Sequence, residues 1–117
     1  IIRIIEKAKN LDYKIILVYS FLPNCATCIE RVKQRVKNGG HNVPEEDIIR
    51  RYYKSITKFW NEYRFIVDEW ILFYNGYNYA PVIVSLGEKD KIEIINEEIQ
   101  NNFMNILNIS QGEINEI

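Results

Sequence analysis

Four arginines and the only histidine of the chain surround a pair of glycines between residues 31 and 51. Along the chain the group reads Arg31, Arg35, Gly39, Gly40, His41, Arg50 and Arg51. A guanidinium group stays charged and donates two parallel hydrogen bonds, which suits it to phosphate oxygens. Glycines give the backbone freedom that a closing lid requires. We therefore expect residues 31–51 to form a lid over an anionic ligand, most commonly a phosphate.

The same residue types also have simpler explanations. The four arginines could lie on a solvated helix surface and form ion pairs with Glu30, Glu45 and Glu46. His41 could contact a phosphate or a ribose, or could be solvated. The sequence contains no G-x-x-x-x-G-K-[ST] loop, no Ser-His-Asp set and no cluster spaced like metal ligands, so we expect no metal site formed by this chain.

Cys25 and Cys28 form a single C-x-x-C motif that leads into a predicted helix. A thioredoxin-like redox site has this arrangement. The alternative is two small residues in the first helical turn of a protein from a reducing compartment. A zinc site would need a second pair of ligands at suitable spacing, which the sequence lacks.

Composition limits the function classes. The chain has 117 residues, 47% of them apolar and 26% charged, which is ordinary for one globular domain or part of one. A net charge of −1 argues against general nucleic-acid binding. No apolar run is long enough for a membrane span and no signal peptide is evident, so we expect a cytoplasmic protein without a membrane partner. Because the first residue is isoleucine, we expect a truncated chain.

Hydrophobic periodicity predicts the elements around the glycine pair. Helices are expected at residues 1–10, 25–37, 44–67 and 96–108, and strands at residues 13–21, 70–75, 81–86 and 92–95. Asn24 is a suitable N-cap for the second helix. The continuous apolar run at 13–21 is typical of a strand buried on both faces. The buried stripe expected on the long helix is Ile49, Tyr52, Tyr53, Ile56, Phe59, Trp60, Tyr63, Ile66 and Val67. This order predicts an α/β protein with a mainly parallel sheet and flanking helices.

The run RVKQRVKNGGHNVPEEDIIRRYYKS resembles the zeta-toxin-like kinases, a branch of the P-loop NTPases. Members of that family carry RV-x-x-RV-x-x-GGH-x-VP, then an isoleucine, paired arginines and a tyrosine. A strand of the KIILVYSFLP type precedes this run, and a D-x-W-x-x-Y-N segment follows it, matched here by Asp68, Trp70, Tyr74 and Asn75. The match covers residues 7 to about 86. It departs from the family at Tyr74, which replaces part of a Tyr-Asp pair, and at Asn75-Gly76, where relatives often carry Asn-Ser.

The resemblance implies that residues 1–117 are a single partial domain, the C-terminal half of a P-loop NTPase-like kinase truncated before its first strand and P-loop. It implies that Arg35 and Arg50, or Arg51 in its place, are catalytic lid arginines. The residues implied to bind ATP with its Mg²⁺ are Arg31, Arg35, His41, Arg50 and Arg51. The implied partners are a small-molecule acceptor such as a nucleotide-activated amino sugar and an antitoxin protein, with no nucleic acid.

Without the P-loop, this chain alone is expected to be inactive even if its parent transfers phosphate. The alternative function is a non-catalytic remnant that acts only as a binding domain. A weaker alternative is an RNA-binding module that uses the arginine pairs, which the near-neutral charge disfavours.

Overall fold

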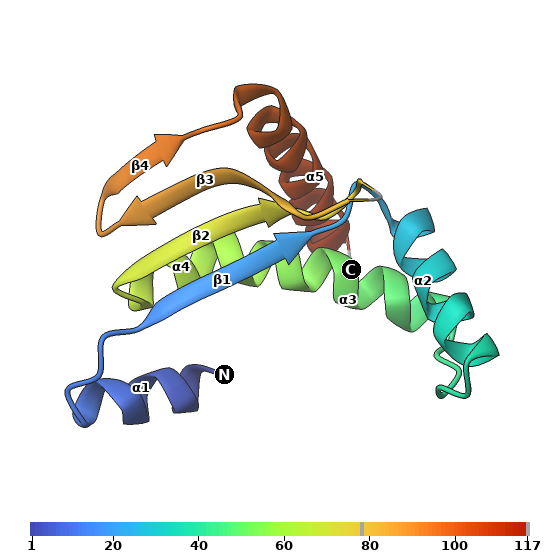
Figure 1. Cartoon of the computed structure of the whole chain (residues 1–117), viewed down its shortest axis with the longest axis horizontal. Helices are drawn as coiled ribbons and strands as arrows, with labels where there is room; N and C mark the ends of the chain where they lie inside the picture. Colours follow the sequence, from blue (N-terminus) through green and yellow to red (C-terminus); the bar gives the residue numbers. More distant parts are fainter. Residues whose placement is uncertain (78, 117) are drawn as a thin grey trace.

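A four-stranded mixed sheet with helices packed against it organises the chain (Figure 1). The structure is a computed structural model that describes residues 1–77 and 79–116, with side chains to residue 112. The elements are α1 (Ile2–Asn10), β1 (Ile16–Phe21), α2 (Cys25–Lys37), α3 (Glu45–Lys58), the π-helical turn η1 (Phe59–Tyr63), α4 (Arg64–Ile66), β2 (Glu69–Tyr74), β3 (Val82–Glu88), β4 (Lys91–Ile94) and α5 (Glu97–Glu116). The predicted α/β class and the predicted order of helices and strands are confirmed.

The strand order is β1-β2-β3-β4, and only β1 and β2 run parallel. Both β2 with β3 and β3 with β4 pair antiparallel. The prediction of a mainly parallel sheet is therefore wrong. The physical reason lies in the connections, because the tight turn between β3 and β4 permits only an antiparallel hairpin, whereas the β1–β2 connection contains helices long enough for a parallel crossover.

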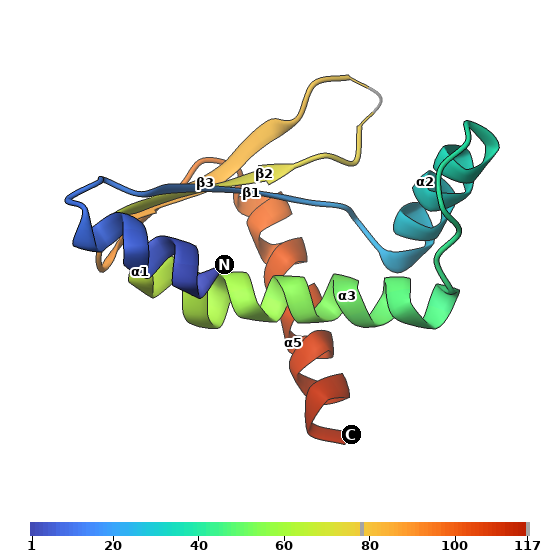
Figure 2. The same ribbon diagram turned by 90° about the horizontal axis from the view of Figure 1, so that it is seen from below.

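The outward face of β1 is open to solvent. Ile16 and Val18 are 52% and 57% exposed, whereas Phe21 on the inward face is 2% exposed. Figure 2 shows the sheet edge-on, with α3 and α5 both on one side of it. The expectation that this strand is buried on both faces is therefore wrong: its apolar residues point alternately toward the helices and toward the uncovered face.

Buried aromatic rings fill the space between the sheet and the helices α3 and α5. The largest are Phe21, Phe59, Trp60, Trp70 and Phe103, all 9% exposed or less. They contact one another mainly edge to face, the geometry that aromatic quadrupoles favour. The core is therefore continuous from β1 through β2 to α5.

The long predicted helix forms as α3, η1 and α4 in succession. Its buried face begins at Ile48, which is 8% exposed, and not at Ile49, which is 39% exposed. Ile48, Tyr52 and Ile56 recur at a spacing of four residues, which keeps them on one helix face. The assignment of Ile49 to the stripe is thus wrong by one residue. Farther along the chain, α5 extends beyond the predicted end at residue 108, and buried Ser110 hydrogen-bonds to Thr57 on α3.

Replacing Gly87 with alanine should destabilise the protein. Gly87 on β3 is buried against Trp70, and a Cβ atom there would overlap the indole ring, which is 1% exposed. Overpacking of this kind costs about 1–3 kcal/mol, so urea denaturation should show a free energy of unfolding lower by about that amount. Gly112→Ala is the control, because its Cβ would enter open space on α5. Equal stability of wild type and Gly87→Ala would contradict this packing argument.

Candidate anion-binding site

A cleft of about 390 Å³ opens at the carboxyl end of β1, between α2 and α3. Arg35 from α2 and Arg51 from α3 both line it. The other lining residues are Tyr19, Ser20, Phe21, Leu22, Cys28, Val32, Val43, Ile48, Tyr52 and Ser55. In α/β proteins the carboxyl ends of parallel strands are where ligands usually bind. The fold thus brings two of the predicted arginines to such an end.

Local hydrogen bonds determine where α2 begins and ends. The Asn24 side chain accepts hydrogen bonds from the Thr27 amide (2.8 Å) and hydroxyl (2.9 Å), which confirms the predicted N-cap. At the other end Gly39 has φ +94°, and the Gly40 amide donates to the Arg35 carbonyl at 2.7 Å. A Cβ on Gly40 would lie 2.9 Å from that carbonyl oxygen. The glycine pair therefore follows the end of α2 at Lys37, and the Gly40 amide closes the turn onto the Arg35 carbonyl.

Two further hydrogen bonds join α3 to β1 and to the residue that follows it. The Tyr52 hydroxyl donates to the Leu22 carbonyl at 2.7 Å, and the hydroxyls of Tyr19 and Ser55 are 2.8 Å apart. Burial of Tyr19 raises the pKa of its phenol to about 12, and burial raises the pKa of Tyr52 as well. Both phenols stay neutral at physiological pH. They position the wall of the cleft that carries Arg51, and they contribute no charge to it.

Neither the Arg35 nor the Arg51 guanidinium group makes an ion pair with any carboxylate of the described residues. The expected ion pairs of the arginines with Glu30, Glu45 and Glu46 do not form among those residues. An exposed cation without a partner can bind an external anion at no cost of breaking an existing pair. The cleft therefore combines two available cations with the hydroxyls of Ser20 and Ser55.

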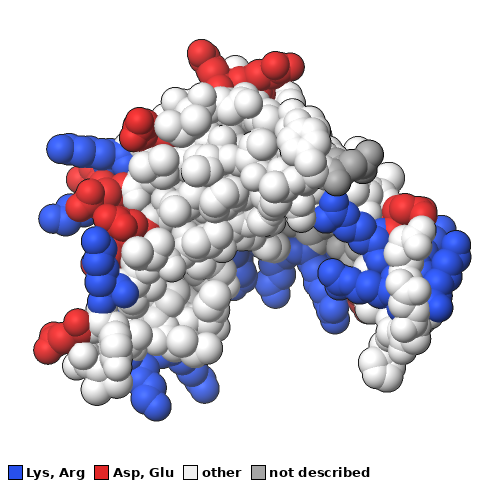
Figure 3. All heavy atoms as spheres, in the orientation of Figure 1, with Lys and Arg blue, Asp and Glu red and all other residues white. Residues whose placement is uncertain are grey.

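The other three predicted binding residues lie outside the walls of this cleft. Arg31 is half-buried and donates from Nη2 to the Asn75 carbonyl at 2.7 Å. Arg50 forms an ion pair with Asp47 at 3.2 Å. His41 is exposed in the segment between α2 and α3. Figure 3 shows Lys and Arg side chains gathered around α2, at the end of the molecule far from α1.

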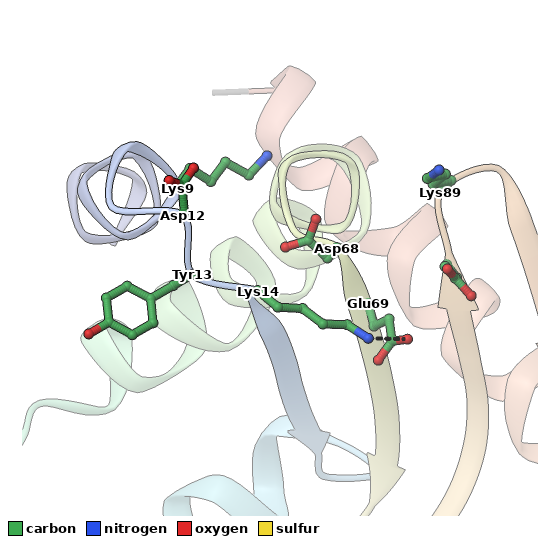
Figure 4. Close-up of a pocket in the computed structure, with 8 residues that line it drawn as sticks. Lys9, Asp12, Tyr13, Lys14, Asp68, Glu69 and Lys89 are labelled. Carbon is green, nitrogen blue, oxygen red and sulfur yellow. Dashed lines mark ion pairs between the residues drawn. The ribbon is translucent and has the colours of Figure 1, made fainter.

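A second pocket lies at the opposite end of the sheet (Figure 4). Lys14 and Glu69 form an ion pair at 3.1 Å there, and Asp68 accepts a hydrogen bond from the Ile15 amide at 2.7 Å. Lys9 and Glu88 are also among its lining residues. Asp68, a residue of the family-like segment, thus ties the start of β1 to the start of β2. The pocket mixes both signs of charge, and its ion pair and hydrogen bond join the starts of β1 and β2, which favours a structural explanation.

A metal site needs several ligating side chains close together, and a membrane span needs a long apolar helix. The residues described by the structure include no group of three or more His, Cys, Asp or Glu side chains able to hold a metal ion. None of the described helices is long and apolar enough to cross a membrane.

Comparison of the chain with protein-family models, with curated proteins and with solved structures found no match.

The cysteine pair at the start of α2 is half-buried and reduced. Burial raises the pKa of the Cys25 thiol, with a hydrogen bond involving Tyr53 acting in the opposite direction. Burial also raises the pKa of Cys28, and the nearby Arg31 charge opposes that shift. A redox-active C-x-x-C motif needs the thiolate, which a lowered pKa supplies. These shifts favour the structural explanation of the pair.

Alkylation should reveal this raised pKa. Because the thiols remain protonated near pH 7, iodoacetamide should modify Cys25 and Cys28 more slowly than it modifies a short cysteine peptide. The modification rate should keep increasing at pH values where the peptide has already reached its plateau. Mass spectrometry across a pH series measures both rates. Faster modification of the protein than of the peptide at neutral pH would restore the redox interpretation.

Proposed function

We propose that this chain supplies the arginine-bearing lid and the C-terminal half of an ATP-dependent small-molecule kinase of the zeta-toxin type. One observation carries the proposal. Arg35 and Arg51 come from two helices joined through a glycine pair, and both line one cleft without an ion pair to any described carboxylate. The resemblance of residues 7 to about 86 to that family supports the same function.

The proposed role of the two arginines is to neutralise charge on the phosphates during transfer. Phosphoryl transfer needs little covalent participation by the protein, and catalysis comes mainly from positioning and charge stabilisation. Two guanidinium groups that approach from opposite walls would bind oxygens of neighbouring phosphates. The exposed position of both side chains lets them follow the ligand as the lid closes.

The residues present fit the phosphates of ATP better than they fit its metal ion. The Arg35 and Arg51 guanidinium groups and the Ser20 and Ser55 hydroxyls can donate to phosphate oxygens. Mg²⁺ prefers carboxylates, water and phosphate oxygens, and none of the residues lining the cleft carries a carboxylate. We therefore assign no metal ligand to this chain and no step that depends on the metal.

The edge of β1 offers a place for a phosphate-binding loop. Among the described residues β1 pairs on one side only, with β2, and Ile16 and Val18 on its outward face are exposed. The unpaired edge of a strand presents backbone N–H and C=O groups to which another strand can pair. In the proposed kinase, a further strand beside β1 would end next to Arg35 and Arg51 and would supply the loop. The acceptor, a nucleotide-activated amino sugar, and an antitoxin partner are proposed from the family resemblance alone.

Binding of inorganic tripolyphosphate tests the cleft without any base or sugar. Replacing either Arg35 or Arg51 with alanine removes a charge-assisted contact worth about 1.5–3 kcal/mol. Calorimetry should therefore show a Kd for tripolyphosphate that is weaker by about tenfold to a hundredfold in each variant. Arg50→Ala should have a smaller effect, because that side chain already pairs with Asp47.

Arg3→Ala is the matched control, because Arg3 is an exposed arginine on α1 that makes no ion pair with the described carboxylates. An effect of Arg50→Ala as large as that of Arg51→Ala would show that the arginine pair is misassigned. A folded wild-type chain that binds neither tripolyphosphate nor ATP would favour the non-catalytic alternative.

Catalysis provides a separate prediction. In a polypeptide that joins this chain to a phosphate-binding loop, Arg35→Ala should lower the rate of phosphoryl transfer well over tenfold, consistent with the loss of about 1.5–3 kcal/mol. Release of labelled product from γ-labelled ATP measures the rate, with Arg3→Ala as the reference. Unchanged turnover of Arg35→Ala would remove Arg35 from the lid.

A further inference from the structure

Two tyrosine rings stack against each other on the connection between β2 and β3. The ring centroids of Tyr77 and Tyr79 are 4.9 Å apart, and the ring planes differ by 7°. Tyr77 is 40% exposed and Tyr79 is 65% exposed. Among the described residues, Tyr79 has no ring or cation contact other than Tyr77. One face of an aromatic stack is therefore available to a planar ligand.

A continuous series of ring contacts holds this stack in place. Tyr77 packs edge to face on Tyr74 at 5.0 Å, Tyr74 on Phe21 at 5.3 Å, and Phe21 on Phe103 at 4.9 Å. Phe21 and Phe103 belong to the buried core. The outermost ring is thus positioned from the interior of the protein. An aromatic surface ordered in advance loses little entropy when it binds a ligand.

The tyrosine stack is linked to the arginine cleft. Phe21 lines that cleft and is also the register partner of Tyr74 in the parallel β1–β2 pair. Arg31, on the same helix as Arg35, donates to the Asn75 carbonyl directly after Tyr74. Figure 1 shows that β1 leads into α2, and β2 into its connection to β3, at the same end of the sheet, where α2 packs beside α3. The tyrosine stack and the arginine cleft therefore lie at the carboxyl ends of two neighbouring strands, β2 and β1.

We infer that the exposed face of Tyr79 is the stacking surface for the base of the nucleotide whose phosphates occupy the arginine cleft. This inference rests on the proposed function and deepens it by assigning the base-binding residue. Every nucleobase has a flat π face, so stacking on a tyrosine accepts different bases, with preferences set by stacking strength. Purine nucleotides should accordingly bind more tightly than pyrimidine nucleotides, with little distinction between ATP and GTP.

Comparing ATP with inorganic tripolyphosphate isolates the contribution of the base. In calorimetry on the full chain, Tyr79→Ala should weaken ATP binding about tenfold, which corresponds to about 1.4 kcal/mol, and should leave the Kd for tripolyphosphate unchanged. Tyr79→Phe should retain the wild-type affinity, because stacking needs the ring and not the hydroxyl. Tyr13→Ala is the matched control, since Tyr13 is 66% exposed at the opposite end of the sheet.

Proton NMR supplies a readout that does not depend on affinity. ATP should shift the Tyr79 ring resonances upfield through the ring current of the base, whereas tripolyphosphate should not. Three results together would overturn the inference. ATP and tripolyphosphate would bind wild type with equal affinity, Tyr79→Ala would leave the Kd for ATP unchanged, and ATP would leave the Tyr79 ring resonances unshifted. If wild type binds neither ligand, the proposed function fails together with the inference. If both ligands bind and both bindings weaken in Arg35→Ala, the proposed function stands whatever the outcome at Tyr79.

Discussion

Phe59 is completely buried at the point where α3 becomes the π-helical turn, and its ring contacts three other elements. It stacks on Tyr19 of β1 at 4.4 Å and meets Trp70 of β2 and Phe103 of α5 edge to face. This junction sets the direction of α3 relative to the sheet, so that the N-terminal half of α3 extends past the end of β1 (Figure 2). Arg51 lies on that extension. The position of the cleft thus depends on a core contact two helical turns away.

The parallel pairing of β1 with β2 is the second constraint. It places the carboxyl ends of both strands at one edge of the sheet, where Phe21 faces Tyr74 in register. The helix after β1 carries Arg35, and the connection after β2 carries Tyr77 and Tyr79. Cations and aromatic rings therefore gather at one end. The amino ends of the same strands bear Lys14 and Glu69, which neutralise each other.

Local signals in the sequence were sufficient for the element order and for the ends of α2, because Asn24 and the glycine pair act through adjacent backbone groups. Local signals were insufficient wherever residues far apart in the sequence decide which side chains are buried or in contact. The apolar run in β1 places apolar side chains on both faces of the strand. Only the packing of the helices against the sheet shows that one of these faces is uncovered. Arg50 and Arg51 are adjacent and chemically identical, and they differ because Asp47 pairs with Arg50. Asp47 stands three residues before Arg50 and four before Arg51, and both spacings permit a helical ion pair, so the sequence alone could not choose between them. The ring series from Phe103 to Tyr79 was not visible in the sequence either, since its members come from three separate segments.

The two parts of the proposed site differ in how firmly they are held. Tyr79 is connected to the core through successive ring contacts, whereas Arg35 and Arg51 have no ion-pair partner among the described residues. Both guanidinium groups are exposed, so water and salt screen their mutual repulsion and the open cleft tolerates them without an anion. A nucleotide would therefore pay little entropy at the tyrosines and more at the arginines, where side chains must become ordered. In the proposed kinase, the base would therefore dock on a preformed surface first, and the arginines would then close over the phosphates.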